Sequence, residues 1–275
     1  MDKSIEYFCE MNMLLSNKNK YVEYWYKTSY RETYTSIRKT VTCTKGPQRK
    51  INMYLFGSTI GRTNYPCYYD KDGYHNLPRP YAHYKPKSIA RQTIDRAWFT
   101  EFVGDIEKAV IYFLRQLYPY SKKAKMTLFY MELSKKVIPM ECRICGSCFN
   151  HMTMLGNLKY EVNSEIKAHI DEEDIVTALF HIGEPKSGGS TLYFDGVSSK
   201  NKGKIQHVVP FQHGRLQVGF FNETVHAAGE WEGIRGGINL NLKRNVLRFF
   251  QNKELSKYYD QYKRAGFPSD NFVAI

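Results

Sequence analysis

The residues best suited to chemistry lie in the stretch "EIKAHIDEED", residues 165–174, which places His169 and Asp171 two positions apart. The segment before them alternates in the manner of a β-strand. On extended backbone, residues two apart share a face, so both side chains would point the same way. Two histidines and one carboxylate, with coordination positions left open, suit a non-haem Fe(II) that reacts with oxygen. The pair therefore predicts two of three ligands of an open metal site.

The third ligand would be a histidine from later in the chain, where His181, His207, His213 and His226 are the candidates. His181 ends an apolar segment, which favours a packing or turn residue. His207 and His213 flank the segment "VVPF" and its turn. His226 follows a predicted strand and turn, and the small residues "AAG" after it leave room for a metal ion. We therefore predict His226 as the third ligand.

The ordered set "HIDEED", "SGGSTLYFD" and "GRLQVGFFNETVHAAGEWEGIRGGINLNL" resembles the Fe(II)/2-oxoglutarate-dependent dioxygenase superfamily over about residues 150–248. The resemblance implies that His169, Asp171 and His226 hold iron. It also implies that Arg235 pairs with the distal carboxylate of 2-oxoglutarate, because a planar guanidinium can bind a carboxylate through two parallel hydrogen bonds. The implied cofactors are Fe(II), 2-oxoglutarate and O2, with ascorbate as a further candidate. The implied reaction releases succinate and hydroxylates a C–H bond.

The cosubstrate site departs from the family pattern at one position. Some relatives have Ser or Thr two residues after the basic residue, whereas this chain has Gly237. Another hydroxyl must then help to hold the cosubstrate, and Thr191 is the candidate that we place in the site, with Thr177 and Tyr193 as alternatives.

Two residues that precede the ligand pair, Tyr160 and Asn163, are also candidates for the cosubstrate cavity. Three residues apart on a regular strand, they would face opposite sides, so a regular strand would bring only one of them to the cavity.

One long helix is expected over residues 93–119, "TIDRAWFTEFVGDIEKAVIYFLRQLYP". Its apolar residues recur at three- and four-residue steps and form one stripe. Thr93 or Asp95 can cap its start, and Pro119 ends it. We expect this helix to support a sheet.

Strands are expected on both sides of that helix. The first 60 residues alternate aromatic or β-branched with polar residues, and residues 61–90 have the Gly, Pro, Asn and Tyr content of an ordered loop region. After the helix, short apolar segments are separated by the turn signals "KSGGS", "KNKG", "QHG" and "GEWEG". The predicted strands are "KMTLFYMEL", "LKYEVNSEIKAHI", "DIVTALFHI", "STLYFDG", "KIQHVVPF", "RLQVGFF" and "GGINLNLK".

Short strands at this spacing predict a sandwich or barrel of antiparallel sheets. The fold class is therefore α+β and mainly β, and the resemblance implies a double-stranded β-helix (jelly-roll) core supported by at least one long helix. We divide the chain into a basic, Tyr-rich extension (1–92), an oxygenase core (93–250) and a helical tail (251–275).

The formal net charge of +13 is distributed unevenly. Lys and Arg exceed Asp and Glu in residues 1–150 and 201–275, whereas the acidic residues prevail in 151–200. A basic field favours polyanionic partners, nucleic acid first, and ordinary solubility is the simpler explanation. Our leading hypothesis is oxidation of a nucleic-acid base, most naturally the methyl group of a 5-methylpyrimidine. In chemistry this resembles the ten-eleven-translocation and J-base dioxygenases.

Two other functions fit the same residues. One is a protein hydroxylase that resembles the prolyl and lysyl hydroxylases and acts on an extended peptide, for which the basic charge would suit an acidic sequence. The other is a β-helix binding module that has lost turnover, against which the intact ligand set argues.

The segment "ECRICGSCFNH" places Cys142, Cys145, Cys148 and His151 at three-residue intervals. Such spacing is compatible with zinc. Zinc sites usually draw ligand pairs from separate segments, however, so buried thiols are the favoured interpretation.

The six cysteines do not form the pattern of a secreted disulfide framework. The N-terminus is a poor signal peptide, and no apolar run has the length of a membrane span. We expect an intracellular monomer without a membrane partner.

Overall fold

The computed structural model describes residues 8–12, 52–60, 67–70, 73–76, 78–80, 97–157 and 164–251. The chain divides into two compact units. The first unit contains Met1–Tyr54 and Thr153–Asn241, and the second contains Leu55–Met152 and Leu242–Ile275.

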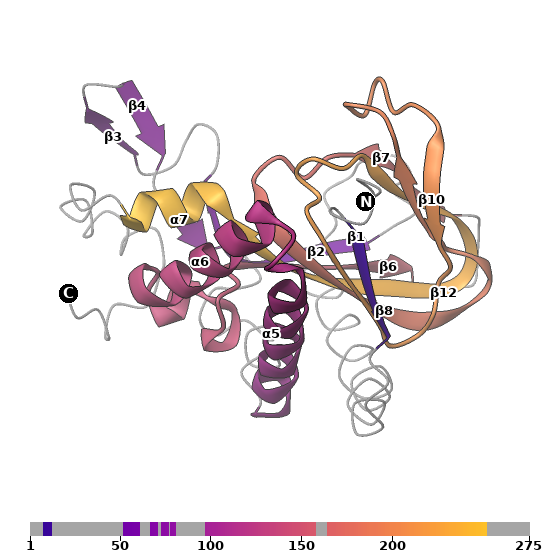
Figure 1. Ribbon diagram of the computed structural model, residues 1–275, viewed down its shortest axis with the longest axis horizontal. Helices are drawn as coiled ribbons and strands as arrows, with labels where there is room; N and C mark the ends of the chain where they lie inside the picture. The colour runs from indigo at the N-terminus through magenta and orange to yellow at the C-terminus, as the bar shows by residue number, and fades with distance from the viewer. Residues whose placement is uncertain are drawn as a thin grey trace. The chain divides into compact units, whose positions relative to one another are not determined.

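The first unit is built from two sets of neighbouring strands that share one long strand, β12 (His226–Lys243). In one set the order is β1-β11-β8-β12-β6, with β1 (Phe8–Asn12), β11 (Arg215–Gly219), β8 (Asp174–Gly188) and β6 (His151–Asn157). In the other set, β7 (Ser164–His169) and β9 (Thr191–Phe194) both pair with β12, and β10 (Ile205–Val209) pairs with β9. Figure 1 shows β12 as the long strand that runs through this unit.

The pairing gives the strand order of a double-stranded β-helix. From β6 to β9, successive strands alternate between the two sets; β10 stays in the second set beside β9, and β11 is in the first set. β12 pairs with β7 and β9 near its start, and it also pairs with β8 and β6. The pairs β7–β12, β9–β12, β10–β9 and β11–β8 are antiparallel. The predicted fold class, α+β and mainly β with a double-stranded β-helix, is confirmed.

The space between the two sets is filled by apolar side chains. Leu179 on β8, Tyr193 on β9, Val209 on β10 and Phe221 after β11 form one buried cluster. Burying such side chains stabilises the fold by roughly 1.5–3 kcal/mol each. The cluster therefore ties strands of both sets into one core.

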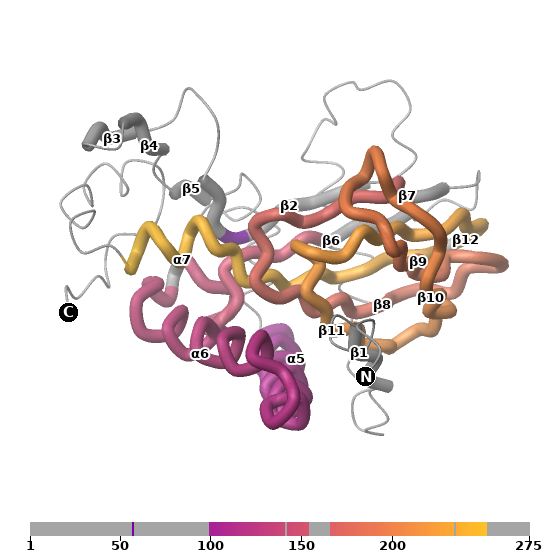
Figure 2. Tube along the Cα trace, turned by 45° about the horizontal axis from the view of Figure 1, so that its top comes forward, coloured from indigo at the N-terminus to yellow at the C-terminus, as the bar shows by residue number. Residues whose placement is uncertain are grey.

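The second unit contains the helices α5 (Ala97–Leu117), α6 (Lys122–Val137) and α7 (Arg244–Gln251) and the short 3-10 turns η3 (Met140–Cys142) and η4 (Ile144–Gly146). It also contains the paired ends of β2 (Asn52–Ile60) and β5 (Pro78–Pro80). A small hairpin joins β3 (Cys67–Asp70) to β4 (Gly73–Asn76). The Cα trace in Figure 2 shows α5 and α6 as consecutive helices of this unit.

The long helix predicted from the sequence is present as α5. Its buried face carries the apolar stripe at helical spacing: Phe99, Phe102, Val103, Ile106, Val110 and Leu114. The helix ends two residues before Pro119, as the missing N–H of proline requires. Thr93 and Asp95, the predicted caps, lie outside the described residues.

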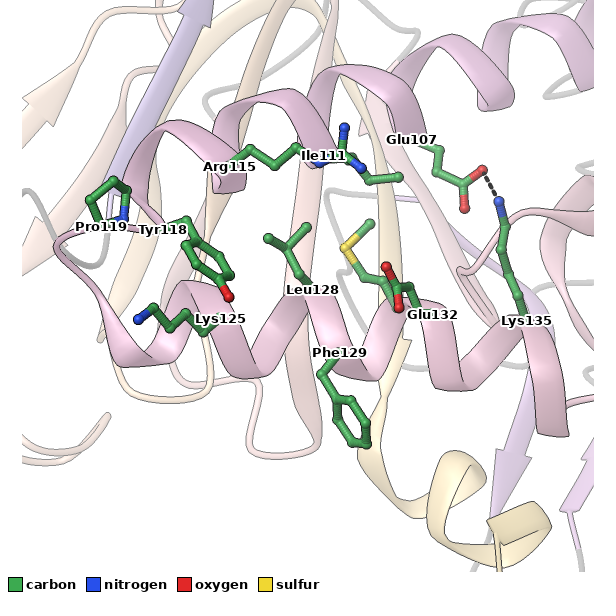
Figure 3. Close-up of a pocket in the computed structure, with 11 residues that line it drawn as sticks. Glu107, Ile111, Arg115, Tyr118, Pro119, Lys125, Leu128, Phe129, Glu132 and Lys135 are labelled. Atoms are coloured by element: carbon green, nitrogen blue, oxygen red, sulfur yellow. Dashed lines mark hydrogen bonds and ion pairs between the residues drawn. The ribbon is translucent and has the colours of Figure 1, made fainter.

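A groove of about 570 Å³ lies between α5 and α6 (Figure 3). Ile111, Leu128 and Met131 line its apolar part. At one end Lys135 forms an ion pair of 2.9 Å with Glu107, the end seen at the right of Figure 3. No cluster of metal-ligating side chains is present among the described residues of this helical unit.

The prediction of a strand for "KMTLFYMEL" is wrong, because this segment forms the middle of α6. Ser121 caps this helix, since its hydroxyl accepts the N–H of Ala124 at 3.2 Å. The buried residues Ala124, Thr127, Met131 and Ser134 recur at three- and four-residue steps. The β-branched and aromatic content suggested a strand, but the helical period decides how the segment can bury a face.

Two loop predictions also differ from the structure. "GEWEG" was expected to be a turn, yet β12 runs through it without interruption. Residues 61–90, expected to be a loop region, contain the short strands β3, β4 and β5.

At the chain ends, most of the predicted N-terminal strands and the tail 252–275 lie outside the described residues. Among the described helices, none has the length and apolar character that crossing a membrane would require.

Candidate metal centre

Two adjacent strands bring His169 and His226 together. His169 is the last residue of β7, His226 is the first of β12, and the two are direct partners in the antiparallel register. Partners on antiparallel strands lie on the same face of the sheet, so their side chains meet. The ring centroids are 4.2 Å apart, with 52° between the ring planes.

The sequence predicted that Asp171 would lie on the same strand as His169. In the structure β7 ends at His169, and Asp171 reaches the same point from beyond the end of that strand. Its backbone N–H donates to the carbonyl of Phe221 at 3.0 Å, and its own carbonyl accepts the N–H of Asp174 at 2.8 Å. The carboxylate oxygens lie 3.9 Å from Nε2 of His169 and 3.6 Å from Nε2 of His226. These bonds fix the main chain of Asp171 in a position where its carboxylate lies near Nε2 of both imidazoles.

Both histidines have their second ring nitrogen held by a backbone carbonyl. Nδ1 of His169 lies 2.8 Å from the carbonyl of Lys167, and Nδ1 of His226 lies 3.0 Å from that of Thr224. A carbonyl can only accept, so each Nδ1 carries the proton and donates it. The lone pair of each neutral ring is then on Nε2, which is the arrangement that metal-ligating histidines show.

The environment keeps His226 neutral. Burial, followed by the neighbouring His169, lowers the pKa of His226 from 6.5 to about 4, although the Asp171 carboxylate and the Thr224 carbonyl act in the opposite direction. A neutral imidazole can bind a metal ion at physiological pH without first losing a proton. The pKa therefore favours ligation over a charged ion pair with Asp171.

The three donor groups fit a single metal ion. One group of three potential metal-ligating side chains is present among the described residues, and it consists of His169, Asp171 and His226. The ligand atoms of these side chains all lie within 4.8 Å of one another. Two imidazoles and one carboxylate on one side of an ion leave the opposite positions open, which suits Fe(II) chemistry with oxygen. The side chain of His169 is 39% exposed and that of His226 is 8% exposed, so the group is accessible from the His169 side.

The ring of Phe221 packs against the buried His226. Its ring centroid lies 4.3 Å from that of His226, and the residue is 1% exposed. His226 is thus packed between the rings of Phe221 and His169, which restricts the rotation of its imidazole.

Arg235, the predicted cosubstrate ligand, is buried on β12. Its Nε donates to the carbonyl of Gly189 at 2.9 Å, and its guanidinium lies 4.9 Å from the Trp231 ring and 5.5 Å from the Phe211 ring. Gly189 has a φ of +81°, and a Cβ there would collide with the Arg235 side chain. The glycine therefore allows the backbone to approach the arginine closely.

A group of buried polar side chains includes the predicted Thr191. Gln217 is at its centre, since its Oε1 accepts the Tyr193 hydroxyl at 2.7 Å and its Nε2 donates to Thr191 Oγ1 at 3.2 Å. The same Nε2 lies 2.8 Å from Nε2 of His181. Burial and then the charge of Arg235 lower the pKa of His181 well below 6.5, so this ring is neutral.

Sequence reasoning missed Gln217, although one signal was available. It is the one amide in the otherwise apolar strand "LQVGFF", and an amide in such a strand needs buried partners. Thr177, an alternative candidate, belongs elsewhere, because its hydroxyl donates to Asp174 at 2.8 Å and accepts from Asn241 at 2.9 Å.

The remaining histidine candidates do not join the metal-ligand group. His181 is buried within β8, as the packing interpretation expected. His207 is on β10, and His213 accepts the N–H of Gly183 at 3.0 Å. Tyr160 and Asn163, the other predicted cosubstrate residues, lie outside the described residues.

The cysteine segment shows buried thiols rather than a gathered ligand set. Cys142 and Cys148 are fully buried, and the described residues of this segment form no group of three close ligand atoms. Burial and the adjacent Glu107 raise the pKa of the Cys148 thiol well above 9.0. A thiol in this state is a poor metal ligand and a poor nucleophile.

No protein-family model matches the sequence, and no curated protein matches it. The fold is similar to that of several solved structures. One is a prolyl hydroxylase from Trichoplax adhaerens in complex with a hypoxia-inducible-factor oxygen degradation domain peptide fragment. The alignment has 10% identity and a TM-score of 0.41, and it covers 91% of this chain and 90% of that chain.

Two bacterial structures match over a shorter range. An oxidoreductase of the 2OG-Fe(II) oxygenase family from Burkholderia pseudomallei has 16% identity and a TM-score of 0.28, over 35% of this chain and 44% of that one. A Pseudomonas putida prolyl-4-hydroxylase has 20% identity and a TM-score of 0.26, over 34% and 50%. The chain thus spans half or less of either bacterial protein.

Proposed function

We propose that this protein is an Fe(II)- and 2-oxoglutarate-dependent dioxygenase. The observation that carries the proposal is the geometry of His169, Asp171 and His226. Two imidazoles are oriented with Nδ1 on a backbone carbonyl, and the carboxylate of Asp171 lies near Nε2 of both. Fe(II) held there, with 2-oxoglutarate as cosubstrate, would supply the activation of dioxygen for hydroxylation of a C–H bond.

The protein's own residues prepare the site before any ligand arrives. The Lys167 and Thr224 carbonyls accept from Nδ1 of each histidine, which selects the tautomer whose lone pair is on Nε2. Asp171 supplies the negative charge that offsets a divalent cation. Packing of Phe221 against His226 keeps the buried ligand in place. The geometry is therefore preorganised, which lowers the cost of binding a metal.

Arg235 is proposed to bind the distal carboxylate of the cosubstrate. It is a cation in a buried setting, where an ionic hydrogen bond is strong because water does not compete. Some relatives have a Ser or Thr hydroxyl at the position of Gly237, and we propose that the Thr191 hydroxyl takes its role in binding the cosubstrate. Its hydroxyl already accepts from Gln217, so its own proton is available to a carboxylate.

For the substrate, we propose a nucleic-acid base, with the methyl group of a 5-methylpyrimidine as the reacting position. The support is the net charge of +13 and its concentration outside residues 151–200, which hold the first two proposed iron ligands. A basic surface would bind the phosphates of the backbone while the reacting base is flipped out of the duplex. The alternative is a peptide hydroxylase of the prolyl or lysyl type, and a binding module without turnover is the third possibility.

Mass spectrometry of nucleosides tests the substrate. Methylated DNA is incubated with the protein, Fe(II), 2-oxoglutarate and oxygen, with the His169→Ala variant as control. Oxidised 5-methylcytosine or thymine that is absent from the control would support base oxidation. Unchanged nucleosides together with succinate production would support dioxygenase activity but exclude this substrate. A wild-type protein that binds iron but forms no succinate would favour the binding module.

A further inference from the structure

A groove of about 670 Å³ lies over β7, β9 and β12, the strands that carry His169, Thr191 and His226. Its lining combines aliphatic or aromatic side chains with lysines: Ile166, Leu192, Phe194, Lys167, Lys200 and Lys202. Small residues of β12, such as Ala227 and Gly229, provide the hollow, because they leave the backbone uncovered by bulky side chains.

The groove is on the opposite face of these strands from the candidate metal centre. His226 is the direct partner of Tyr193, and the next pair is Ala227 with Leu192. Side chains alternate between faces along a strand, so Leu192 and Ala227 point away from the His226 side. The groove is therefore a separate surface and not the entrance to the metal site.

An ordered hairpin, residues 195–204, provides two of the three lysines. Asp195 Oδ1 accepts the N–H of Lys204 at 2.7 Å, and the N–H of Gly196 donates to the carbonyl of Lys202 at 2.9 Å. Lys202 Nζ lies 5.2 Å from the centroid of the Phe194 ring. The β9–β10 hairpin is the loop that projects from this unit beside β10 in Figure 1. These bonds order the hairpin that carries Lys200 and Lys202, and both residues line the groove.

The charge of the groove is not balanced internally. Its lining has three ammonium groups and one carboxylate, that of Glu230. Within the part of the chain that the structure describes, Lys167, Lys200 and Lys202 make no ion pair. An occupant with negative charge would complete these interactions.

We propose that this groove docks an acidic, extended peptide segment of a partner protein. Carboxylates would pair with the lysines at the rim, and apolar side chains at alternate positions would contact Leu192 and its neighbours on the floor. A nucleic-acid strand fits less well, because strands without sequence preference bind by stacking bases on aromatic rings. The one ring here, Phe194, is 7% exposed and has Lys202 above it. This docking does not depend on the proposed catalytic function.

Fluorescence anisotropy with the full-length protein tests the proposal. The probe is a labelled 12-residue peptide in which Glu and Leu alternate. Comparison peptides replace every Glu by Gln, or every Leu by Ser, and a single-stranded 12-nucleotide DNA is the fourth probe. The test variant is Lys200→Glu/Lys202→Glu. The matched control is Lys122→Glu/Lys136→Glu, which changes the net charge equally at exposed positions of α6.

The proposal predicts that Lys200→Glu/Lys202→Glu weakens binding of the Glu/Leu peptide by about tenfold or more, because two charge pairs become repulsive. The control variant should change binding by less than about twofold, and both comparison peptides should bind more weakly than the probe. Equal losses in the two variants, equal binding of the Leu-to-Ser peptide, or lysine-dependent binding of the DNA alone would each overturn it. Iron binding measured in parallel should be the same in all three proteins.

Discussion

His169 and His226 are direct partners across two antiparallel strands, and their ring centroids are 4.2 Å apart. His169 is the last residue of β7 and His226 is the first residue of β12, although 57 positions separate them in the sequence. A metal ion bound to both would therefore join two strands that are otherwise linked here by backbone hydrogen bonds. Metal binding and local folding should be coupled at this point.

Replacing either histidine or Asp171 by alanine should weaken Fe(II) binding by at least about 100-fold, because each supplies one of three donors. Anaerobic calorimetry with Fe(II), or with Co(II) as an air-stable substitute, measures this. His207→Ala is the matched control, since His207 is an exposed histidine outside the ligand group. A His226→Ala protein that is folded and binds Fe(II) as tightly as the control would refute the ligand assignment.

The metal-free protein should lose stability as the pH falls from about 6.5 towards 4. The pKa of His226 is about 4 in the folded protein and close to 6.5 in the unfolded chain, so the unfolded chain binds a proton first. The effect of this residue reaches about 3 kcal/mol at the acid end of that range. His181 acts in the same direction, because its pKa is also lowered by burial.

Urea unfolding at several pH values checks this expectation. The His226→Gln variant should show a shallower fall in the free energy of unfolding than the wild type. The His207→Gln variant, altered at an exposed histidine, should follow the wild type. Parallel curves for all three proteins would show that His226 is not kept neutral by its surroundings.

Replacing Arg235 should impair cosubstrate binding and leave metal binding intact. Arg235→Lys keeps the charge but loses the planar fork, so the Kd for 2-oxoglutarate should rise by about tenfold. Arg235→Met removes the charge and should raise that Kd by roughly 100-fold. Fluorescence of Trp231, whose ring lies 4.9 Å from the guanidinium, is a convenient signal in the metal-loaded protein. Unchanged affinity in Arg235→Met would remove Arg235 from the cosubstrate site.

Gln217→Ala should destabilise the first unit by about 2–3 kcal/mol. The change removes the acceptor of the Tyr193 hydroxyl and the donor to Thr191, and buried polar groups that lose their partners are costly. Gln212→Ala, at an exposed glutamine before β11, should cost much less. Denaturant unfolding compares the two. Equal losses would mean that the buried network contributes little.

The grouping of His169, Asp171 and His226 could be predicted from the sequence because its parts are locally specified. The spacing of His169 and Asp171 and the small residues after His226 each have a direct chemical meaning. The geometry of Asp171 was not predictable, since its position depends on a hydrogen bond to Phe221, 50 residues away. Only the folded chain brings these two segments together.

Elsewhere, tertiary context decided against local signals. The α6 segment contains residues with a preference for strands, yet the Ser121 cap and the helical spacing of its buried residues determine a helix. The role of Gln217 depends on three partners from other strands, so its position within one strand could only mark it as unusual. In both cases the deciding interactions are distant in sequence.

Succinate formation from 2-oxoglutarate tests the central claim most directly. Purified protein with Fe(II), 2-oxoglutarate and oxygen is compared with the His226→Ala variant, and the iron content of both is measured. The proposed function predicts oxygen-dependent succinate release by the wild type that falls to background in the variant. Wild-type protein that contains Fe(II) but releases no succinate, or equal release by the variant, would contradict it.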